Sequence, residues 1–219
     1  MLVIFDLDGT LLNTIADLAS ATNHALAQCG YPTHSPQAYP YFVGNGVRRL
    51  IERVLPEDCR TPAEVERLLS HFRTYYSAHL TDATVPYPGI TELLESLRSR
   101  GIDVAVASNK YQAAVERLIL HFFPQIEWAA VEGQKEGIPV KPDPSIVFDI
   151  LQRCPTPKRH VVYVGDSGVD MDTARRASVT AVGVTWGFRS EKELREHYAD
   201  YIVSEPDRIL GIVEDPDRR

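Results

Sequence analysis

Hydrophobic and polar positions divide the chain into a helical block and a mixed block. Between residues 14 and 83, apolar side chains recur every three or four residues, which predicts amphipathic helices and no strand. We expect one helix from Thr14-Ile-Ala-Asp17, which has the form of a capping box, to Gly30. A second should stop at Pro56, and a third should start at Thr61-Pro-Ala-Glu64, where a capping residue precedes a proline.

The mixed block combines short apolar runs, typical of buried strands, with helical patterns. A linker with Pro86, Pro88 and Gly89 separates it from the helical block. Strands are expected at Leu2–Phe5, 104–107, 128–131, 161–164, Thr180–Val184 and Tyr201–Val203. Helices are expected around residues 90–97, 115–122, 147–151, 190–197 and 209–213.

Strands that alternate with helices indicate an α/β fold with a doubly wound parallel sheet, as in Rossmann-like proteins. The helical block then becomes an insertion after the first strand. We predict a core formed by residues 1–13 and 85–219 and a smaller all-helical cap domain at 14–84. The cap should lie over the carboxyl ends of the strands, where sheets of this kind place their sites.

The first strand ends in two carboxylates. Leu2–Phe5 has no polar residue, and Asp6, Asp8, Gly9 and Thr10 follow directly. Because side chains alternate along an extended chain, Asp6 and Asp8 point the same way. Two such anions repel unless a proton or a cation lies between them, and Mg²⁺ prefers carboxylate ligands. A plain polar turn is the alternative, but paired carboxylates favour a site.

Composition narrows the choice of partners. The chain has 219 residues, 44% hydrophobic and 24% charged, which is ordinary for a soluble protein with a substantial core. A net charge of −7 argues against nucleic-acid binding and means that a phosphate site needs a local cation. Cys29, Cys59 and Cys154 lack C-x-x-C spacing, which favours a reducing compartment. With no membrane span and no signal peptide expected, we predict a cytoplasmic protein.

Other predicted strand and loop ends add a consistent set of polar residues. Together with Asp6 and Asp8 they are Ser108, Asn109, Lys141, Asp166 and Asp170. Ser108, the backbone amide of Asn109 and Lys141 would hold phosphoryl oxygens, beside the hydroxyl of Thr10.

This set suits transfer of a phosphoryl group to an aspartate. Ionised Asp6 can attack phosphorus without first losing a proton. Mg²⁺ held by Asp6, Asp166 and the backbone carbonyl of Asp8 would offset the repulsion between nucleophile and phosphate. The side chain of Asp8 is then free to protonate the leaving oxygen and later to deprotonate the attacking water.

Four motifs resemble, in order, those of the haloacid dehalogenase superfamily: Asp6-Leu-Asp-Gly-Thr10, Ser108, Lys141 and Gly165-Asp-Ser-Gly-Val-Asp170. The whole chain is similar to the helical-cap subgroup. The resemblance implies a nucleophile at Asp6, an acid/base at Asp8 and Mg²⁺ ligation by Asp6, Asp8 and Asp166. It also implies that Asp170 binds the metal through water or orients Lys141. The second aspartate favours the phosphatase branch, because dehalogenases of the superfamily lack it.

Within that branch, three segments look most similar to phosphoglycolate phosphatases: Ser108-Asn-Lys110, Lys141-Pro-Asp-Pro144 and Val43-Gly-Asn-Gly46. Caps of this kind meet the non-reacting end of the substrate, so Gly44, Asn45 and Arg48 are candidate substrate contacts. Arg48 could pair with the second anionic group of 2-phosphoglycolate. Alternatively, Arg48 is a solvated charge beside the apolar stripe of its helix.

The predicted activity is Mg²⁺-dependent hydrolysis of a small phosphorylated metabolite, with 2-phosphoglycolate, giving glycolate and phosphate, as the preferred candidate. Pyrophosphate, nucleotide monophosphates and sugar phosphates stay open because the core motifs do not choose among them. The protein should act as a monomer or homodimer, without a nucleic-acid or membrane partner.

Two non-enzymatic alternatives share parts of this pattern. A signalling receiver also phosphorylates an aspartate, but it has roughly 120 residues and no helical insertion. A silent binding protein would be expected to lack one of the four core residues Asp6, Asp8, Lys141 and Asp166, and all four are present.

Two further features are expected to have structural rather than catalytic roles. Lys110 is expected to be a charge of the loop or of the surroundings of the site. Trp186-Gly-Phe-Arg189 is expected to be packing at its rim.

Overall fold

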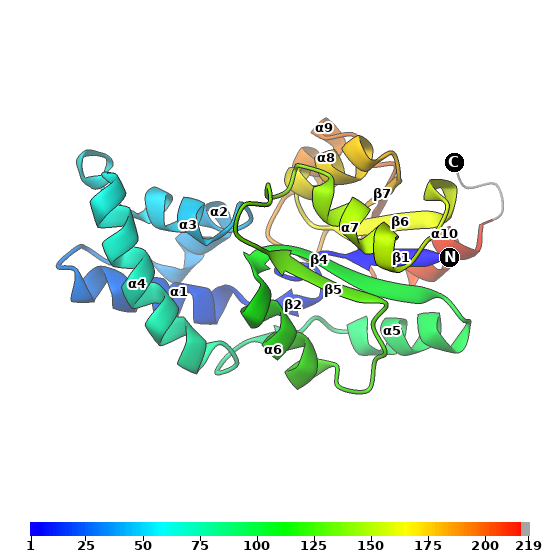
Figure 1. Ribbon diagram of the computed structural model, residues 1–219, viewed down its shortest axis with the longest axis horizontal. Helices are drawn as coiled ribbons and strands as arrows, with labels where there is room; N and C mark the ends of the chain where they lie inside the picture. The colour runs from blue at the N-terminus through cyan, green and yellow to red at the C-terminus, as the bar shows by residue number, and fades with distance from the viewer. Residues whose placement is uncertain (216–219) are drawn as a thin grey trace.

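A six-stranded parallel sheet forms the core of the protein, and the computed structural model describes residues 1–215 (Figure 1). The strand order is β5-β4-β1-β6-β7-β8, and every neighbouring pair is parallel. The strands are β1 (Leu2–Phe5), β4 (Asp103–Tyr111), β5 (Ala130–Gln134), β6 (Val161–Gly165), β7 (Thr180–Val184) and β8 (Tyr201–Val203). The predicted doubly wound α/β fold is confirmed.

Helices cover both faces of this sheet, as the alternation within its strands requires. In β1, Val3 and Phe5 pack on one face, whereas Leu2 and Ile4 pack on the other. Three helices cover the first face: α5 (Ile90–Ser99), α6 (Gln112–Phe122) and α10 (Arg208–Glu214). Three cover the second: α7 (Ser145–Arg153), α8 (Gly168–Ala177) and α9 (Glu191–Glu196). Because β1 is apolar on both faces, it lies at the centre of the sheet.

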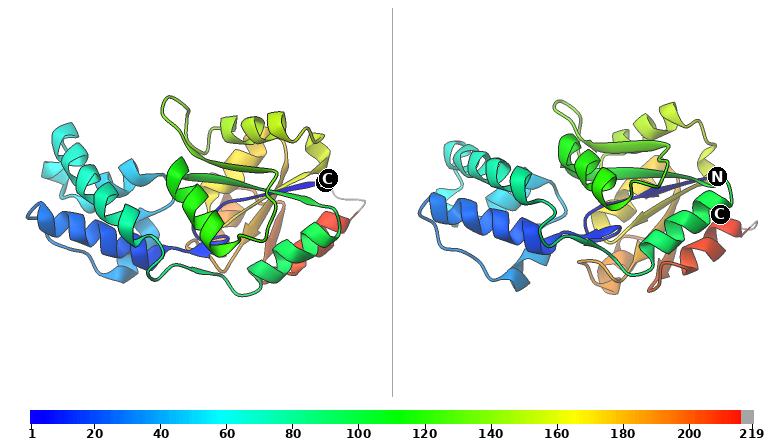
Figure 2. Two further views of the ribbon diagram at one scale, coloured as in Figure 1. Left: turned by 60° about the horizontal axis from the view of Figure 1, so that its bottom comes forward. Right: turned by 90° about the horizontal axis from the view of Figure 1, so that it is seen from below.

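A helical insertion lies beyond the carboxyl ends of the strands, to one side of the sheet (Figures 1 and 2). Its helices are α1 (Ile15–Gln28), α2 (Tyr39–Phe42), α3 (Val47–Val54) and α4 (Pro62–His79). Short 3₁₀ turns are formed by Pro36–Ala38 and Glu57–Cys59 here, and by Lys158–His160 in the core. Within residues 1–215, no helix combines the length and apolarity needed to cross a bilayer.

The two connections between sheet and insertion pair with each other. β2 (Leu12–Asn13) and β3 (Val85–Pro86) form an antiparallel ribbon. The sequence predicted only a linker around β3, because a two-residue strand has no periodicity to detect. The division into two domains at residues 14 and 84 stays a prediction, and its last residues, 216–219, lie outside the described chain.

The predicted capping box at the start of α1 is wrong. Thr14 makes no side-chain cap bond, and its hydroxyl donates instead to Asp8 Oδ1 at 2.7 Å. The carboxylate of Asp17 accepts hydrogen bonds from the backbone of Ala83 and Thr84. Both side chains are therefore used by tertiary contacts rather than by their own helix.

Candidate active site

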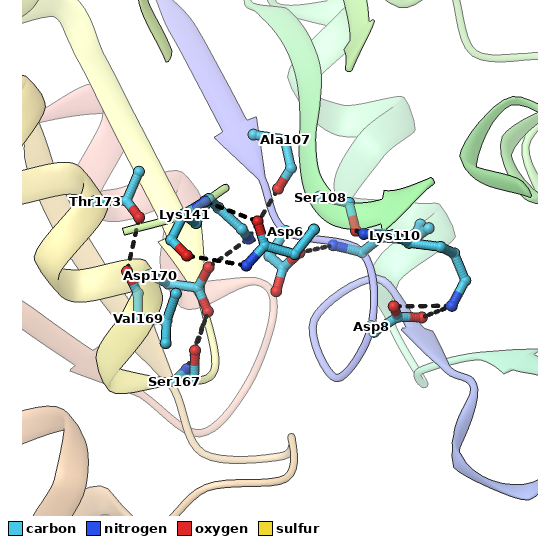
Figure 3. Close-up of polar contacts among 12 residues, drawn as sticks. Asp6, Asp8, Ala107, Ser108, Lys110, Lys141, Ser167, Val169, Asp170 and Thr173 are labelled. Carbon is cyan, nitrogen blue, oxygen red and sulfur yellow. Dashed lines mark hydrogen bonds and ion pairs between the residues drawn. The ribbon is translucent and has the colours of Figure 1, made fainter. Parts of the chain in front are cut away.

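The polar residues predicted from the strand ends converge at the carboxyl edge of the sheet (Figure 3). Asp6 follows β1, Ser108 lies within the end of β4, and Asp166 follows β6. β4 and β6 flank β1 in the sheet, so these three chain segments lie side by side. Lys141 reaches the same point from the loop between β5 and α7.

Lys141 lies between two carboxylates. Its ammonium is 2.9 Å from Asp6 Oδ1, donates to Asp170 Oδ1 at 2.7 Å, and donates to the carbonyl of Ala107 at 3.0 Å. Asp170 also accepts from the hydroxyl of Ser167 at 2.6 Å. Lys141 is only 2% exposed, so these contacts fix its ammonium in a single position beside Asp6, the candidate nucleophile.

Burial decides the ionisation of this pair. The pKa of Asp6 is raised to about 7, mainly because burial desolvates its carboxyl group; Asp170 and Asp8 act in the same direction, and Lys141 opposes them. For Lys141, burial acts to lower the pKa, but the carboxylates of Asp170 and Asp6 raise it well above its ordinary value. Lys141 is therefore a permanent cation in a site that carries excess negative charge.

Asp166 completes a cluster that could hold a cation. Oxygens of Asp6, Asp166 and Asp170 lie within 4.8 Å of one another, and all three residues are buried. Desolvation, with Asp170 and Asp6 nearby, raises the pKa of Asp166 well above its ordinary value. Three buried carboxylates share one lysine, so the cluster lacks positive charge. An oxygen-only donor set of this kind fits a hard divalent cation such as Mg²⁺.

Gly9 lets the chain pass close to this cluster. Its φ is 88°, and a Cβ at this position would overlap the carboxylate of Asp166. A side chain at residue 9 would therefore displace Asp166, which explains the glycine in the first motif.

The side chain of Asp8 turns away from the cluster. Both of its carboxylate oxygens accept hydrogen bonds from Lys110 Nζ at 2.9 Å (Figure 3). Thr14 donates to Oδ1 as well. Asp6 and Asp8 consequently serve different partners, which allows one to be a nucleophile while the other exchanges protons.

Lys110 lies within β4 rather than in a loop, and it is only 7% exposed. Its ammonium is 5.1 Å from the centre of the Tyr76 ring, on α4 of the insertion. Burial acts to lower the pKa of Lys110, whereas the carboxylate of Asp8 raises it, and the net change is upward. Sequence reasoning missed this contact because it ended the strand at Ala107. Had the strand been extended, alternation would have placed Ser108 and Lys110 on one face.

A small cavity opens above these residues, between the sheet and the insertion. Its volume is about 40 Å³. Polar residues form its floor: Asp6, Asp8, Ser108, Asn109 and Lys110. The insertion supplies mostly apolar walls: Leu18, Val43, Gly44, Gly46, Val47, Leu50, Phe72 and Tyr76. The cavity therefore has polar and charged side chains on the side of the sheet and a mostly apolar surface on the side of the insertion.

Comparison with known proteins agrees with this architecture. The sequence profile of haloacid dehalogenase-like hydrolases matches residues 3–184. The chain belongs to this hydrolase family. The match spans β1 to β7, so it includes every strand that contributes to the site.

Individual relatives cover almost the whole chain. A phosphoglycolate phosphatase of Mesorhizobium japonicum is 32% identical over 210 residues, which are 95% of this chain and 92% of that one. One of Agrobacterium fabrum is 34% identical over 189 residues, 85% of this chain and 81% of that one. A crystal structure from Lactobacillus delbrueckii, described as a candidate phosphoglycolate phosphatase, has a TM-score of 0.90 and 34% identity, with 96% and 97% of the two chains covered.

The substrate contacts predicted in the insertion do not all face the cavity of this hydrolase. Gly44 lines it. The side-chain oxygen of Asn45 accepts from Arg53 at 2.7 Å. Arg48 is half exposed, lies 3.7 Å from Glu52 and pairs with Glu66, away from the lining residues. Its position matches the solvated alternative.

Two other predicted residues, Thr10 and Asn109, lie in the turn after β1 and within β4. The hydroxyl of Thr10 is buried and has no hydrogen-bond partner among residues 1–215. The side chain of Asn109 accepts from the backbone of Lys141 at 2.8 Å and donates to the carbonyl of Gly44 at 3.3 Å. Asn109 thus ties the Lys141 loop and the insertion to the end of β4.

Proposed function

We propose that this chain hydrolyses a small phosphate monoester, with 2-phosphoglycolate as the preferred substrate, to glycolate and phosphate. The observation that carries the proposal is the pair of aspartates on one cavity floor. Asp6 is held beside Lys141, and Asp8 is held separately by Lys110. This arrangement provides a nucleophile with a fixed cation and an independent proton carrier.

In the first step, a carboxylate oxygen of Asp6 attacks phosphorus and the bond between phosphorus and the leaving oxygen breaks. Asp8 gives its proton to that oxygen, so glycolate leaves as an alcohol and an aspartyl-phosphate remains. In the second step, water attacks the same phosphorus while Asp8 takes a proton from it. Phosphate leaves, Asp6 is regenerated, and Asp8 has recovered its proton.

Neighbouring groups hold the phosphoryl oxygens during both steps. We propose that Lys141, the hydroxyl of Ser108 and the backbone amide of Asn109 bind these oxygens, since Lys141 lies 2.9 Å from Asp6 and Ser108 and Asn109 line the cavity. The hydroxyl of Thr10, buried without a hydrogen-bond partner among residues 1–215, is a further candidate donor. Asp6 and Asp166 would hold Mg²⁺ with the backbone carbonyl of Asp8. When bound, the ion offsets the charge of phosphate and nucleophile.

Asp170 has a different set of contacts. It accepts from Lys141, Ser167 and Tyr163, the last at 3.3 Å. We propose that Asp170 orients Lys141 and contributes to the metal site through its charge or through water.

The size and charge of the cavity support a short acidic substrate. A volume of about 40 Å³ corresponds to roughly three water-sized spheres, which suits a two-carbon acid better than a hexose or a nucleoside. Among the described residues that line the cavity, Lys110 is the one cation. A second anionic group would therefore meet Lys110 rather than Arg48. The names of the relatives point to the same ester.

A panel of esters tests the proposal. Phosphate release would be measured with Mg²⁺ from 2-phosphoglycolate, pyrophosphate, nucleoside monophosphates and hexose phosphates. We expect kcat/KM for 2-phosphoglycolate to exceed the others by at least about 10-fold, a difference of 1.4 kcal/mol. Preference for a nucleotide or hexose phosphate would overturn the substrate but leave the reaction class. Absence of phosphate release from every ester would overturn both.

The setting of the reaction is part of the proposal. Cys29, Cys59 and Cys154 are free thiols, as expected for a reducing compartment. We place the enzyme in the cytoplasm, as a monomer or homodimer.

A further inference from the structure

The loop after β7, Trp186-Gly-Phe-Arg189, contacts both acidic turns of the site. The indole of Trp186 donates to the carbonyl of Thr10 at 3.0 Å, and the amide of Phe188 donates to Asp166 Oδ2 at 2.6 Å. A Cβ on Gly187 would overlap both Asp166 and the carbonyl of Gly9. The base of this loop is therefore hydrogen-bonded and closely packed against the core. The sequence predicted only packing at the rim of the site.

Arg189 extends from this fixed base to the insertion. Its guanidinium donates to the carbonyl of Val43 at 2.8 Å and to that of Pro40, residues almost 150 positions earlier in the chain. The side chain is only 15% exposed. Hydrogen bonds from a charged donor to two carbonyls are about twice as strong as neutral ones.

The contacted stretch, which we name cap segment 40–46, forms part of the cavity wall. Val43, Gly44 and Gly46 line the cavity, and Gly44 also accepts a hydrogen bond from Asn109. The core thus holds this segment from two sides, through Asn109 within β4 and through Arg189 after β7.

A second arginine shapes the same segment from within the insertion. Arg53 on α3 donates to the carbonyl of Phe42 at 2.8 Å and to the side chain of Asn45 at 2.7 Å. Loss of Arg189 should therefore remove one of the two contacts between this segment and the core without unravelling the segment. Glu193, whose carboxylate is 3.5 Å from the Arg189 guanidinium, offers a partner when the cap contacts are broken.

We infer that Arg189 is a positioning residue that fastens cap segment 40–46 to the core and so keeps the cavity closed over the phosphate site. The inference rests on the proposed function only for the identity of the substrate. Closure confines the small leaving group and excludes bulk water. A larger leaving group, such as an aryl ester, exceeds the cavity and requires the segment to be displaced.

Hydrogen exchange followed by mass spectrometry tests the contact without reference to activity. In Arg189→Ala we expect the amides of residues 41–46 to exchange at least about 10-fold faster, because one of the segment's two anchors to the core is lost. Arg189→Lys should restore part of the protection, since an ammonium can donate to one of the two carbonyls. Arg48→Ala, which removes an exposed arginine of the neighbouring helix, is the matched control and should change nothing there.

Kinetics with two esters tests the consequence. For Arg189→Ala we expect KM for 2-phosphoglycolate to rise about 10-fold with a smaller change in kcat, and kinetics with p-nitrophenyl phosphate to change little. A general loss of structure would lower both activities alike. If Arg189→Ala does not yield folded protein, Arg189→Lys carries both measurements.

Unchanged exchange in residues 41–46, or equal losses for the two esters, would overturn the role of Arg189. If the unmodified protein does not hydrolyse 2-phosphoglycolate, the proposed substrate fails, but the exchange experiment still decides the role of Arg189.

Discussion

Asp8 and Lys110 show how one residue pair can separate two roles on a single strand end. Asp6 and Asp8 share the same sequence surroundings, yet Asp8 is bound by an ammonium on both oxygens while Asp6 faces Lys141. The ammonium of Lys110 also lies against the ring of Tyr76. Lys110 therefore contacts both the carboxylate of Asp8 and the Tyr76 side chain in the cavity wall.

We expect Lys110→Met to lower kcat for 2-phosphoglycolate by roughly 10²-fold, within the range attributed to a positioned acid/base. Without the ammonium, Asp8 loses two charge-assisted hydrogen bonds and its fixed orientation. Steady-state kinetics would show the loss, with Lys192→Met as control because Lys192 is exposed and pairs with the surface residue Glu196. Near-normal kcat in Lys110→Met would show that Lys110 is not needed to position Asp8.

Asp6→Asn tests the nucleophile. The amide keeps the size of the side chain but removes the charge that attacks phosphorus, so we expect turnover to fall at least about 10³-fold. Acid-quenched samples should lose the aspartyl-phosphate adduct in mass spectra. Asp82→Asn, at an exposed carboxylate paired with His79, should retain both signals. An adduct that persists in Asp6→Asn would place the nucleophile elsewhere.

The sequence predicted the acidic residues better than the basic one. Asp6 and Asp8 could be predicted because they follow an uninterrupted apolar strand, whose end lies at the carboxyl edge of the sheet. The expectation that both side chains point the same way is wrong, because the strand ends at Phe5 and Asp8 turns to Lys110. Lys110 could not be predicted, since the polar stretch Ser108-Asn-Lys110 looks like the end of a strand although β4 continues to Tyr111. For Arg48 the sequence left a substrate contact and a solvated charge both open, because a charge beside an apolar stripe does not indicate which neighbour it pairs with; in the structure it pairs with Glu66.

Among the elements, one buried carboxylate joins α1 to the two residues that precede β3. Asp17, 3% exposed, accepts from the amide of Ala83 at 2.9 Å, from the amide of Thr84 at 2.8 Å and from the hydroxyl of Thr84 at 2.7 Å. These bonds connect the first turn of the insertion to the chain that leaves it. Asp17 therefore holds the chain segment that enters the insertion against the segment that leaves it.

We expect Asp17→Ala to lower the free energy of unfolding by about 3 kcal/mol, because it leaves three donors without an acceptor in a buried setting. Urea unfolding monitored by circular dichroism would measure it. Asp17→Asn, which keeps one acceptor, should lose less, and Asp82→Ala on the exposed surface should stay within about 0.5 kcal/mol of the unmodified protein. A loss of that small size in Asp17→Ala would show that the ribbon alone holds the connections.

Helix ends were the least predictable part of the elements. Thr61 caps α4 as its local sequence indicates, by accepting from the amide of Glu64 at 3.3 Å. Thr14 and Asp17 have an equally good local signal, but tertiary partners 6 and 66 residues away take their side chains. Local propensity is overridden wherever a terminus lies at the site or at the connection.

At the scale of the whole molecule, the fold could be predicted from the alternation of strands and helices along the chain. Apolar strands covered on both faces require helices on both sides, and a block without strands can only be an insertion. The order of the strands could not be read from the sequence, because all six have similar apolar patterns. That order places β1 between β4 and β6, and so decides which polar ends meet.

The excess negative charge at the centre of the molecule leads to a prediction about Mg²⁺ and stability. Asp6, Asp166 and Asp170 are buried together with one lysine, and burial raises the pKa of Asp6 and of Asp166. Their ionised forms therefore oppose folding until a cation binds. Mg²⁺ that binds only the folded chain should raise the melting temperature as its concentration exceeds the dissociation constant.

Asp166→Asn distinguishes this account from a general salt effect. The variant removes one of the three clustered charges and keeps an oxygen to accept from the amide of Phe188. In EDTA it should melt higher than the unmodified protein, because the repulsion is relieved. On addition of Mg²⁺ it should gain less than the unmodified protein, because a ligand is missing, so the two melting curves should reverse their order. Asp82→Asn should follow the unmodified protein throughout. Equal Mg²⁺-dependent gains in Asp166→Asn and the unmodified protein would show that the ion acts away from this cluster.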